Sequence, residues 1–205
     1  MSQQIHAIIF DFGNVLLEWD PRHVYRRYFP NDEAAMERFL HEVNFMEWNA
    51  QQDKGRSFAD GVAELSRQFP HYADLIQAYH DNWSDSIGHH LHGTVEIMKQ
   101  LKKAGYALYG LSNWSAETFP IAREKYDFFS LLEDRVISGE VGMIKPEPEI
   151  YALLLQKIGR PAQECLFIDD SVDNIEQAKQ LGFATVHFQS SEHLEAELRR
   201  MNILK

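Results

Sequence analysis

The sequence predicts an α/β fold: a Rossmann-like parallel sheet with helices on both faces and an inserted small all-helical cap. Short apolar segments alternate with helical stretches through the second half of the chain. This alternation is typical of βαβ units, which form parallel sheets. A second observation concerns the stretch between the first two apolar segments, which is helical in pattern and contains no strand candidate. We therefore interpret that stretch as an insertion.

Five short segments of apolar and β-branched residues are the strand candidates, and each is bounded by a turn signal or a helical pattern. Their lengths of four or five residues suit buried strands of a parallel sheet. In chain order they are Ala7–Phe10, Ala107–Leu111, Arg135–Ser138, Cys165–Ile168 and Ala184–Phe188.

The helix candidates follow from apolar residues spaced three or four apart and from terminal signals. For example, Val95, Met98 and Leu101 share one face, and Gly105 follows as a stop. The expected core helices cover Thr94–Ala104, Ala116–Lys125, a stretch from Pro148 to a stop at Gly159, Val172–Leu181 and His193–Met201. The expected cap helices are Arg22–Tyr28, Glu33–Val43, Phe58–Phe69 and Ala73–Trp83.

These elements divide the chain into two expected domains. Residues 1–17 and 88–205 form the Rossmann-like core, and residues 18–87 form the helical cap. Linkers are expected near Leu17–Asp20 and Ile87–Gly93. A chain of 205 residues is long enough for one core domain and a small accessory unit, and this size favours a monomer or a dimer.

Composition limits the partners. The formal net charge of −11 disfavours nucleic acid, whose phosphates attract basic surfaces. No apolar run is long enough to span a bilayer, so no membrane partner is expected. The single Cys165 and an N-terminus without a signal-peptide pattern favour a cytoplasmic location.

Polar side chains follow three of the predicted strands. Asp11 follows the first strand, Ser112 and Asn113 the second, and the pair Asp169-Asp170 the fourth. Lys145 lies in a loop ahead of a helix. Each piece alone is typical of a turn or a helix cap. Together they lie at the carboxyl edge of a parallel sheet, where ligands bind, and they suit a hard cation and a phosphate.

The order hhhhDxGNV, hhhLSN, GxxKPxxxIY and hhhDDSxxN, where h is apolar, resembles the four motifs of the haloacid dehalogenase superfamily. The resemblance covers residues 5–17 and 93–190, whereas the cap agrees only in position and helicity. The Asp-x-Gly-Asn variant resembles the subgroup of bacterial glucose-1-phosphate phosphatases. This resemblance implies a Mg²⁺-dependent phosphatase that hydrolyses a small phosphorylated substrate, such as a sugar phosphate, through an aspartyl-phosphate.

The resemblance also implies roles for the motif residues. Asp11 is the expected nucleophile, and Mg²⁺ is expected between the Asp11 carboxylate, the backbone carbonyl of Gly13 and the Asp170 carboxylate. Lys145 is expected to offset negative charge in the transition state and to keep Asp11 ionised.

The remaining roles concern the phosphate and the residues around it. Ser112 and Asn113 are expected to donate hydrogen bonds to the phosphate. Asp169 and Asp173 are expected to orient Lys145 or a metal-bound water. In the cap, Trp19 and His23 are candidates for substrate binding, although an ordinary helix surface would also explain such residues. The same two interpretations apply to Arg26, Arg27 and Trp48.

Gly13 departs from the family pattern. Most phosphatases of this superfamily carry a second Asp two residues after the nucleophile, which serves as the general acid and base. Glycine has no side chain, so another group must supply the proton; His23 and a metal-bound water are the candidates. An anomeric phosphate would need less protonation because its leaving group is better.

Three alternatives remain. A 2-haloacid dehalogenase would share Asp11, Lys145 and the Ser-Asn pair, but dehalogenases replace the acidic pair seen at Asp169-Asp170. A sugar-phosphate mutase would depend on the missing general acid. A non-catalytic module with this fold would have no need for intact Asp11, Lys145 and Asp170.

Overall fold

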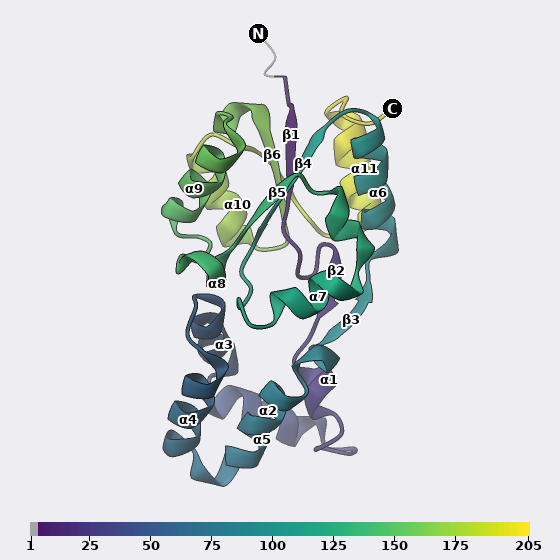
Figure 1. Ribbon diagram of the computed structural model, residues 1–205. Helices are drawn as coiled ribbons and strands as arrows, with labels where there is room; N and C mark the ends of the chain where they lie inside the picture. The colour runs from purple at the N-terminus through teal and green to yellow at the C-terminus, as the bar shows by residue number, and fades with distance from the viewer. Residues whose placement is uncertain (1–3) are drawn as a thin grey trace.

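A five-stranded parallel sheet forms the centre of the protein in the computed structural model, which describes residues 4–205 (Figure 1). The strand order is β5-β4-β1-β6-β7. The predicted fold class is therefore confirmed, and all five strand candidates are strands. Their bounds are β1 Ala7–Phe10, β4 Ala107–Ser112, β5 Asp134–Ile137, β6 Cys165–Asp169 and β7 Ala184–His187.

The central strand β1 is buried along its whole length and pairs with β4 on one side and β6 on the other. Its side chains alternate between two apolar cores. Ile8 and Phe10 belong to one core, and Ala7 and Ile9 to the other. A strand that is covered on both faces needs apolar residues at every position, which explains the uninterrupted apolar segment in the sequence.

Two pairs of helices cover the faces of the sheet (Figure 1). The core that contains Ile8 includes apolar residues of α6 and α11, and the core that contains Ile9 includes those of α9 and α10. The predicted helix Ala116–Lys125 begins three residues late, at Phe119. The helices outside the insertion are α6 His92–Lys103, α7 Phe119–Lys125, α8 Ser138–Val141, α9 Pro148–Ile158, α10 Val172–Gln180 and α11 Ser191–Arg200.

The inserted segment is helical and lies beyond the carboxyl edge of the sheet (Figure 1). Aromatic rings fill its interior: Tyr79 lies 4.8 Å from Phe45 and 6.1 Å from Tyr25 between ring centroids. Its helices are α1 Arg22–Tyr25, α2 Glu33–Glu42, α3 Phe45–Asp53, α4 Phe58–Gln68 and α5 Ala73–Asp81. The division into a core and a cap domain stays a prediction.

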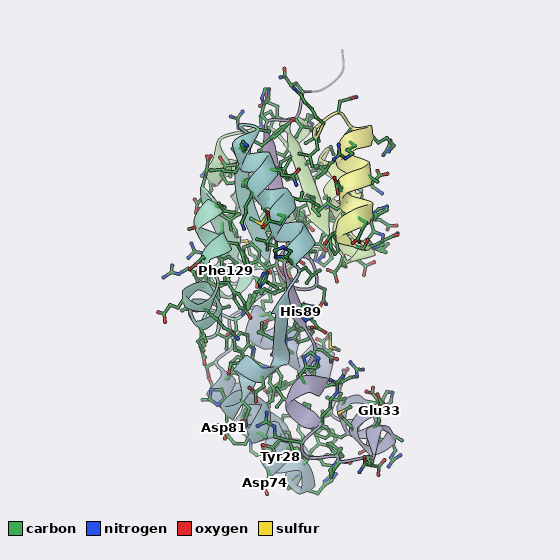
Figure 2. The ribbon with its side chains drawn as sticks, turned by 90° about the vertical axis from the view of Figure 1, so that its right-hand side faces the viewer. Tyr28, Glu33, Asp74, Asp81, His89 and Phe129 are labelled. Atoms are coloured by element: carbon green, nitrogen blue, oxygen red, sulfur yellow. The ribbon has the colours of Figure 1, made fainter. Side chains whose placement is uncertain are left out.

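The two expected linkers pair with each other. β2 (Leu17–Trp19) and β3 (Ile87–His90) form an antiparallel ribbon in which Leu17 lies opposite His90. Segments of three and four residues are too short to show a strand period in the sequence, and their pairing satisfies the backbone groups. Figure 2 shows His89 of this ribbon between the sheet and the helical end, which carries Tyr28 and Asp74.

Helix α3 is absent from the prediction. Its buried residues include Asn49 and Gln52 beside Phe45 and Trp48, so one face is inside without being uniformly apolar. A search for apolar periodicity does not detect such a helix. Within residues 4–205, every helix is too short or too polar to traverse a lipid bilayer.

Candidate active site

A cavity of about 370 Å³ lies between the carboxyl edge of the sheet and the inserted helices. Its volume is in the range of small-molecule sites. Asp11, Lys145 and Asp170 line it from the sheet side, and Asn49 and Asp53 line it from α3. The position agrees with the rule that ligands of open parallel sheets bind beyond the strand ends.

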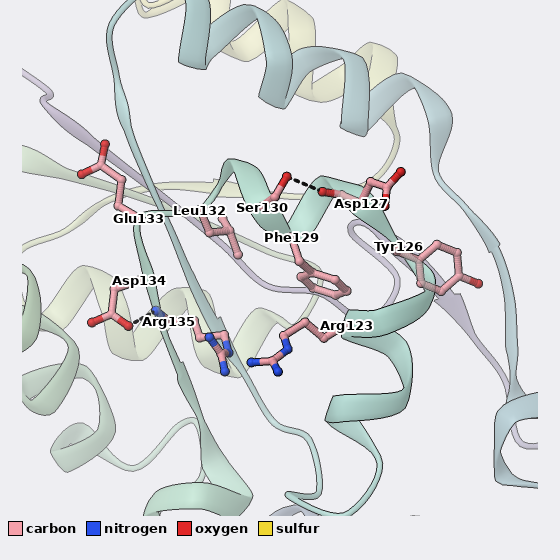
Figure 3. Close-up of a pocket in the computed structure, with 9 residues that line it drawn as sticks. All are labelled: Arg123, Tyr126, Asp127, Phe129, Ser130, Leu132, Glu133, Asp134 and Arg135. Carbon is pink, nitrogen blue, oxygen red and sulfur yellow. Dashed lines mark hydrogen bonds between the residues drawn. The ribbon is translucent and has the colours of Figure 1, made fainter.

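A second cavity of about 430 Å³ lies beside the edge strand β5 (Figure 3). Figure 3 shows the side chains of Arg123 and Arg135 pointing toward one another below Phe129. None of the predicted site residues Asp11, Lys145 and Asp170 lines this cavity. The cavity between the sheet and α3 is therefore the candidate active site, although the other is slightly larger.

Lys145 is the buried centre of the charged cluster. Its Nζ lies 2.9 Å from Asp11 Oδ1 and 2.7 Å from Asp169 Oδ2, and it donates to the carbonyl of Leu111 at 3.0 Å. Burial alone would lower the pKa of Lys145, but the charges of Asp11 and Asp169 outweigh it and raise that pKa. Lys145 is therefore a cation at neutral pH.

Asp169 serves to hold Lys145. The residue is fully buried at the end of β6, and its Oδ1 accepts from the Ser171 backbone N–H at 2.8 Å. The Asn174 amide donates to both carboxylate oxygens, at 3.0 and 3.1 Å. Since both oxygens already have partners, Asp169 orients the lysine more readily than it could bind a ligand directly.

Asp11 is held at one oxygen only. Its Oδ1 accepts from the Phe12 backbone N–H at 2.7 Å and from Lys145. Its Oδ2 has no hydrogen bond to any other group within residues 4–205. Burial raises the pKa of Asp11 to about 7, with Lys145 lowering it and the charges of Asp169 and Asp170 raising it. The free oxygen belongs to a residue that lines the cavity.

The carboxylates of Asp11, Asp169 and Asp170 offer atoms that lie within 4.8 Å of one another. Three carboxylates beside the single ammonium of Lys145 leave an excess of two negative charges when all are ionised. Burial and the charge of Asp169 raise the pKa of Asp170. A divalent cation would offset this excess, and carboxylate oxygens are the ligands that Mg²⁺ prefers. Asp11 and Asp170 belong to this cluster and line the cavity, and so does Gly13, whose carbonyl is the third expected ligand.

The Ser112-Asn113 pair lies at the end of β4, where Asn113 contacts the loop that carries Lys145. The side-chain Oδ1 of Asn113 accepts from the Lys145 backbone N–H at 2.8 Å, and its Nδ2 donates to the Lys145 carbonyl at 3.0 Å. Asn113 therefore fixes the loop that carries the lysine, and because its Nδ2 has a second hydrogen and the residue lines the cavity, its role toward a phosphate stays a prediction. Ser112 ends β4, is 1% exposed and is not among the residues that line the cavity, so its role toward a phosphate stays a prediction.

The cap candidates separate into two cases. Of the two cap candidates, Trp19 of β2 lines the cavity. Asp173, in the first turn of the core helix α10, lines it as well. His23 does not line it: the residue lies on α1, and its Nε2 is 3.8 Å from Glu18 Oε1. The structure therefore does not bring His23 to the place where a proton donor is needed, because α1 directs it to Glu18.

Reasoning from the sequence misses three residues of the site. Asn174 supports Asp169, and Asn49 and Asp53 line the cavity from α3. Asn49 donates to Asp53 Oδ2 at 2.9 Å. Burial raises the pKa of Asp53 to about 7, opposed by the Ser115 backbone N–H and assisted by Asp11. An Asn and an Asp four residues apart are one signal that could have drawn attention to α3.

Comparisons with curated proteins place the chain beside phosphatases and related enzymes. It is 26% identical over 202 residues to a sesquiterpene phosphatase of Aspergillus oryzae, and the match covers 98% of each protein. It is 25% identical over 199 residues to drimenol cyclase of Aspergillus calidoustus. That match covers 95% of this chain but 36% of the cyclase, so the chain spans about a third of that relative.

Solved structures share the fold. A protein described as a predicted haloacid dehalogenase-like hydrolase from Porphyromonas gingivalis has a TM-score of 0.74 at 23% identity, covering 98% of this chain and all of that one. A magnesium complex of a haloacid dehalogenase family enzyme from Bacteroides thetaiotaomicron has a TM-score of 0.73 at 22% identity, covering 95% and 98%.

The family assignment rests on a match to a family model together with the geometry. The family model described as haloacid dehalogenase-like hydrolase matches residues 5–182, which include all of the strand ends that line the cavity. With the nucleophile candidate, the buried lysine and the acidic cluster at one sheet edge, the chain belongs to the haloacid dehalogenase-like hydrolases.

Proposed function

We propose that the protein is a Mg²⁺-dependent phosphatase that hydrolyses a small phosphomonoester through an aspartyl-phosphate on Asp11. One observation carries the proposal. Asp11 is fixed through Oδ1 by Lys145 and a backbone N–H, while its Oδ2 is free beside two further carboxylates in a cavity of small-molecule size. A held carboxylate with one free oxygen is suited to nucleophilic catalysis.

The residues of the chain would act as follows. Asp11 Oδ2 attacks phosphorus, and the bond from phosphorus to the leaving oxygen breaks. Lys145, fixed by Asp169, keeps Asp11 ionised for the attack and offsets the charge that develops on the phosphoryl oxygens. Water then releases phosphate and regenerates the Asp11 carboxylate. When bound, Mg²⁺ supplies the positive charge that lets an anionic nucleophile approach an anionic phosphate.

Relatives support the metal and the reaction. A structure of the Bacteroides thetaiotaomicron enzyme is a complex with magnesium and inorganic phosphate. The Aspergillus oryzae relative, which matches over nearly its whole length, is named as a phosphatase. The excess negative charge around Asp11 also disfavours the dehalogenase alternative, because a 2-haloacid is itself an anion and a dehalogenase uses no cation to offset the repulsion.

Glucose 1-phosphate is the substrate that the motif variant around Gly13 suggests. Asn49 and Asp53 line the cavity opposite the sheet and offer hydrogen-bond partners for sugar hydroxyls. An anomeric leaving group also suits a site without a carboxylate at position 13. This substrate class follows from the resemblance of the Asp-x-Gly-Asn motif, and the two cap side chains are compatible with it.

A second substrate class is the phosphate of an apolar alcohol. The walls of the cavity include Trp19, Met46, Trp83 and Trp114. Most of the surface of these side chains is apolar and cannot form hydrogen bonds with the hydroxyl groups of a sugar. Met46 is 60% exposed and lines the cavity, so its thioether is available to an apolar ligand. The relative named as a sesquiterpene phosphatase points to the same class.

The first experiment measures phosphate release from an aryl phosphate with and without Mg²⁺. We expect activity that EDTA removes and Mg²⁺ restores, and a trapped protein species heavier by one phosphoryl group. Asp170→Ala should raise the Mg²⁺ concentration needed for half-maximal activity at least about tenfold. Activity that survives EDTA unchanged would contradict the proposal. A panel of glucose 1-phosphate, glucose 6-phosphate and phosphates of medium-chain alcohols then separates the two substrate classes.

A further inference from the structure

The position two residues after the nucleophile has no acid, and the structure shows free space there. A Cβ atom added to Gly13 would meet no other atom within 4 Å. Gly13 lines the cavity, so this space is available to a substrate or to a side chain from elsewhere. A leaving alkoxide must take a proton as it departs, and positioned donors contribute about 10²–10⁴-fold to such steps.

Asp53 approaches the same cavity from the opposite wall. It is the last residue of α3, and it lines the cavity together with Asp11 and Gly13. The charge of Asp11 is felt at Asp53 strongly enough to raise the pKa of Asp53. The two carboxyl groups thus line one cavity, although 42 positions separate them in the chain.

Contacts with the sheet side fix the C-terminal end of α3. The Ser138 hydroxyl donates to the backbone carbonyl of Asp53. The next residue, Lys54, pairs with Glu147 just before α9, with 2.5 Å between Nζ and Oε1. The Phe58 backbone N–H donates to Glu117 at 3.0 Å. The inserted helices therefore hold Asp53 at a set position relative to the strand ends.

The hydrogen bonds of Asp53 leave one oxygen for a proton. Oδ2 accepts from Asn49 at 2.9 Å, while Oδ1 accepts no hydrogen bond from another side chain within residues 4–205. The Ser115 backbone N–H is close enough to the carboxyl group to lower its pKa in part, but burial outweighs this contact. Asp53 also sits at a helix C-terminus, where the helix dipole disfavours a negative charge. Burial and Asp11 keep its pKa near 7, so the protonated form is present at neutral pH.

The groups around Asp53 are consistent with a neutral, protonated acid. Across the cavity are Asp11 and the cation Lys145, which is bound to Asp11 and Asp169. The phenol of Tyr79, from α5, is near enough for the charge of Asp53 to raise the pKa of Tyr79. The charge of Lys54 is directed to Glu147, so no cation pairs with the Asp53 carboxyl among the described residues.

The other titratable residues that line the cavity are less suited than Asp53 to donate a proton to the leaving group. Lys145 is bound to two carboxylates, and Asp170 belongs to the cluster that fits the cation. Asp173 is exposed on the first turn of α10, on the sheet side. Asp53 alone among the lining carboxyl groups faces the site from the inserted helices, on the side away from the acidic cluster. In an in-line displacement the leaving group departs away from the nucleophile.

We propose that Asp53 is the general acid and base of the reaction, in the role that position 13 does not fill; the inference rests on the proposed phosphatase function. As Asp11 Oδ2 bonds to phosphorus, the bond to the leaving oxygen breaks, and that oxygen takes the proton of Asp53. The Asp53 carboxylate then removes a proton from the water that attacks the phosphoenzyme. The bond between phosphorus and Asp11 breaks, phosphate leaves, and both aspartates return to their initial states.

The test compares Asp53→Asn with wild type on two substrates: 4-nitrophenyl phosphate, whose leaving group departs unaided, and a primary alkyl phosphate. Asparagine keeps an oxygen for the Asn49 hydrogen bond but cannot donate a carboxyl proton. We expect kcat/KM for the alkyl phosphate to fall about 10²–10⁴-fold. For the aryl ester kcat/KM should change less than about tenfold, because formation of the phosphoenzyme then needs little protonation.

Matched variants separate catalysis from structure. Asp53→Glu should restore part of the alkyl activity if the carboxyl group matters. Asp173→Asn, the same chemical change at another lining carboxylate, should affect both substrates by the same factor. Equal losses on both substrates in Asp53→Asn, with unchanged folding by circular dichroism, would overturn the proposal and assign Asp53 a positioning role.

The phosphatase function can fail separately from this inference. Wild-type protein that releases no phosphate from either ester with Mg²⁺ refutes the proposed function itself. Wild-type protein that is active, combined with an Asp53→Asn variant that treats the two esters alike, refutes only the role of Asp53.

Discussion

The carboxyl edge of the sheet and the inserted helices are held together by different interactions. At the sheet edge, Asp11, Lys145 and Asp169 are buried charges whose contacts to one another and to backbone groups define the site. The insertion is held by aromatic packing around Tyr79, whose ring lies within 4.8–6.2 Å of four other aromatic rings. Charges fix the geometry of a reaction centre, whereas apolar packing holds a wall in place.

The two regions meet at α3. This helix packs Phe45 and Trp48 into the aromatic interior and presents Asn49 and Asp53 to the cavity. The comparison implies that substitutions at the sheet edge abolish the chemistry, whereas substitutions in the insertion change which substrates are used. The following predictions test that difference, from the largest expected effect to the smallest.

The largest effect is expected from Asp11→Asn. An amide cannot form the phosphoenzyme, so kcat should fall by about 10³ or more. The fold should persist, because the amide oxygen can still accept from the Phe12 backbone N–H. Phosphate release and circular dichroism measure the two parts, and retention of more than a few per cent of the activity, a rough allowance for contamination, would refute the covalent mechanism.

Lys145→Met should damage both stability and activity. It leaves Asp11 and Asp169 without their shared cation in a buried place, which typically costs about 3–5 kcal/mol. The loss should be greater at pH 8 than at pH 5, because protonation relieves unpaired carboxylates at the lower pH. Urea unfolding at both pH values measures it. A loss that is equal at the two pH values would show that packing, not charge, dominates.

Trp19→Ala tests the insertion side. Trp19 lines the cavity and takes no part in the ion pairs of Lys145, so we expect KM to rise about tenfold and kcat to change little, the pattern of lost ground-state binding. Tyr28→Ala is a matched control because Tyr28 is exposed at the far end of the insertion (Figure 2). A steep fall in kcat for Trp19→Ala alone would remove the distinction between the two regions.

The last prediction concerns the pH dependence of stability and involves no measurement of the chemistry. The pKa of Asp53 is about 7 in the folded protein against an ordinary value of 3.8. Between these values the folded state holds a proton that the unfolded state has released, so stability falls as pH rises through this window. Asp53→Asn lacks this loss.

Thermal unfolding measures the difference between the two proteins. A pKa raised from 3.8 to about 7 is worth about 4 kcal/mol, so the Tm of Asp53→Asn relative to wild type should increase by about 8–16 °C between pH 4 and pH 8. Because Asp11 remains in both proteins, the subtraction reports the titration of Asp53 together with its coupling to Asp11. A Tm difference that is constant over this range would show that the carboxyl of Asp53 titrates normally.

The sequence by itself determined the fold class, the five strands and the strand-end residues. Buried parallel strands need continuous apolar runs, and the ends of such strands meet at one edge, so the pattern of residues alone is enough to group Asp11 and Asp170. The motif order added the loop residue Lys145 to this group. Resemblance to a family supplied their roles. Local signals of this kind survive in the sequence because each depends on a few consecutive residues.

Only the tertiary structure decided which cap residues reach the cavity. It directs His23 to Glu18, gives the Asn113 side chain to the Lys145 backbone and brings Asp53 to face the acidic cluster. Helix α3 buries amides as well as aromatic rings, so its sequence lacks an apolar stripe. Its contribution depends on contacts between residues far apart in the chain, such as Asp53 with Ser138, and no local pattern encodes such contacts.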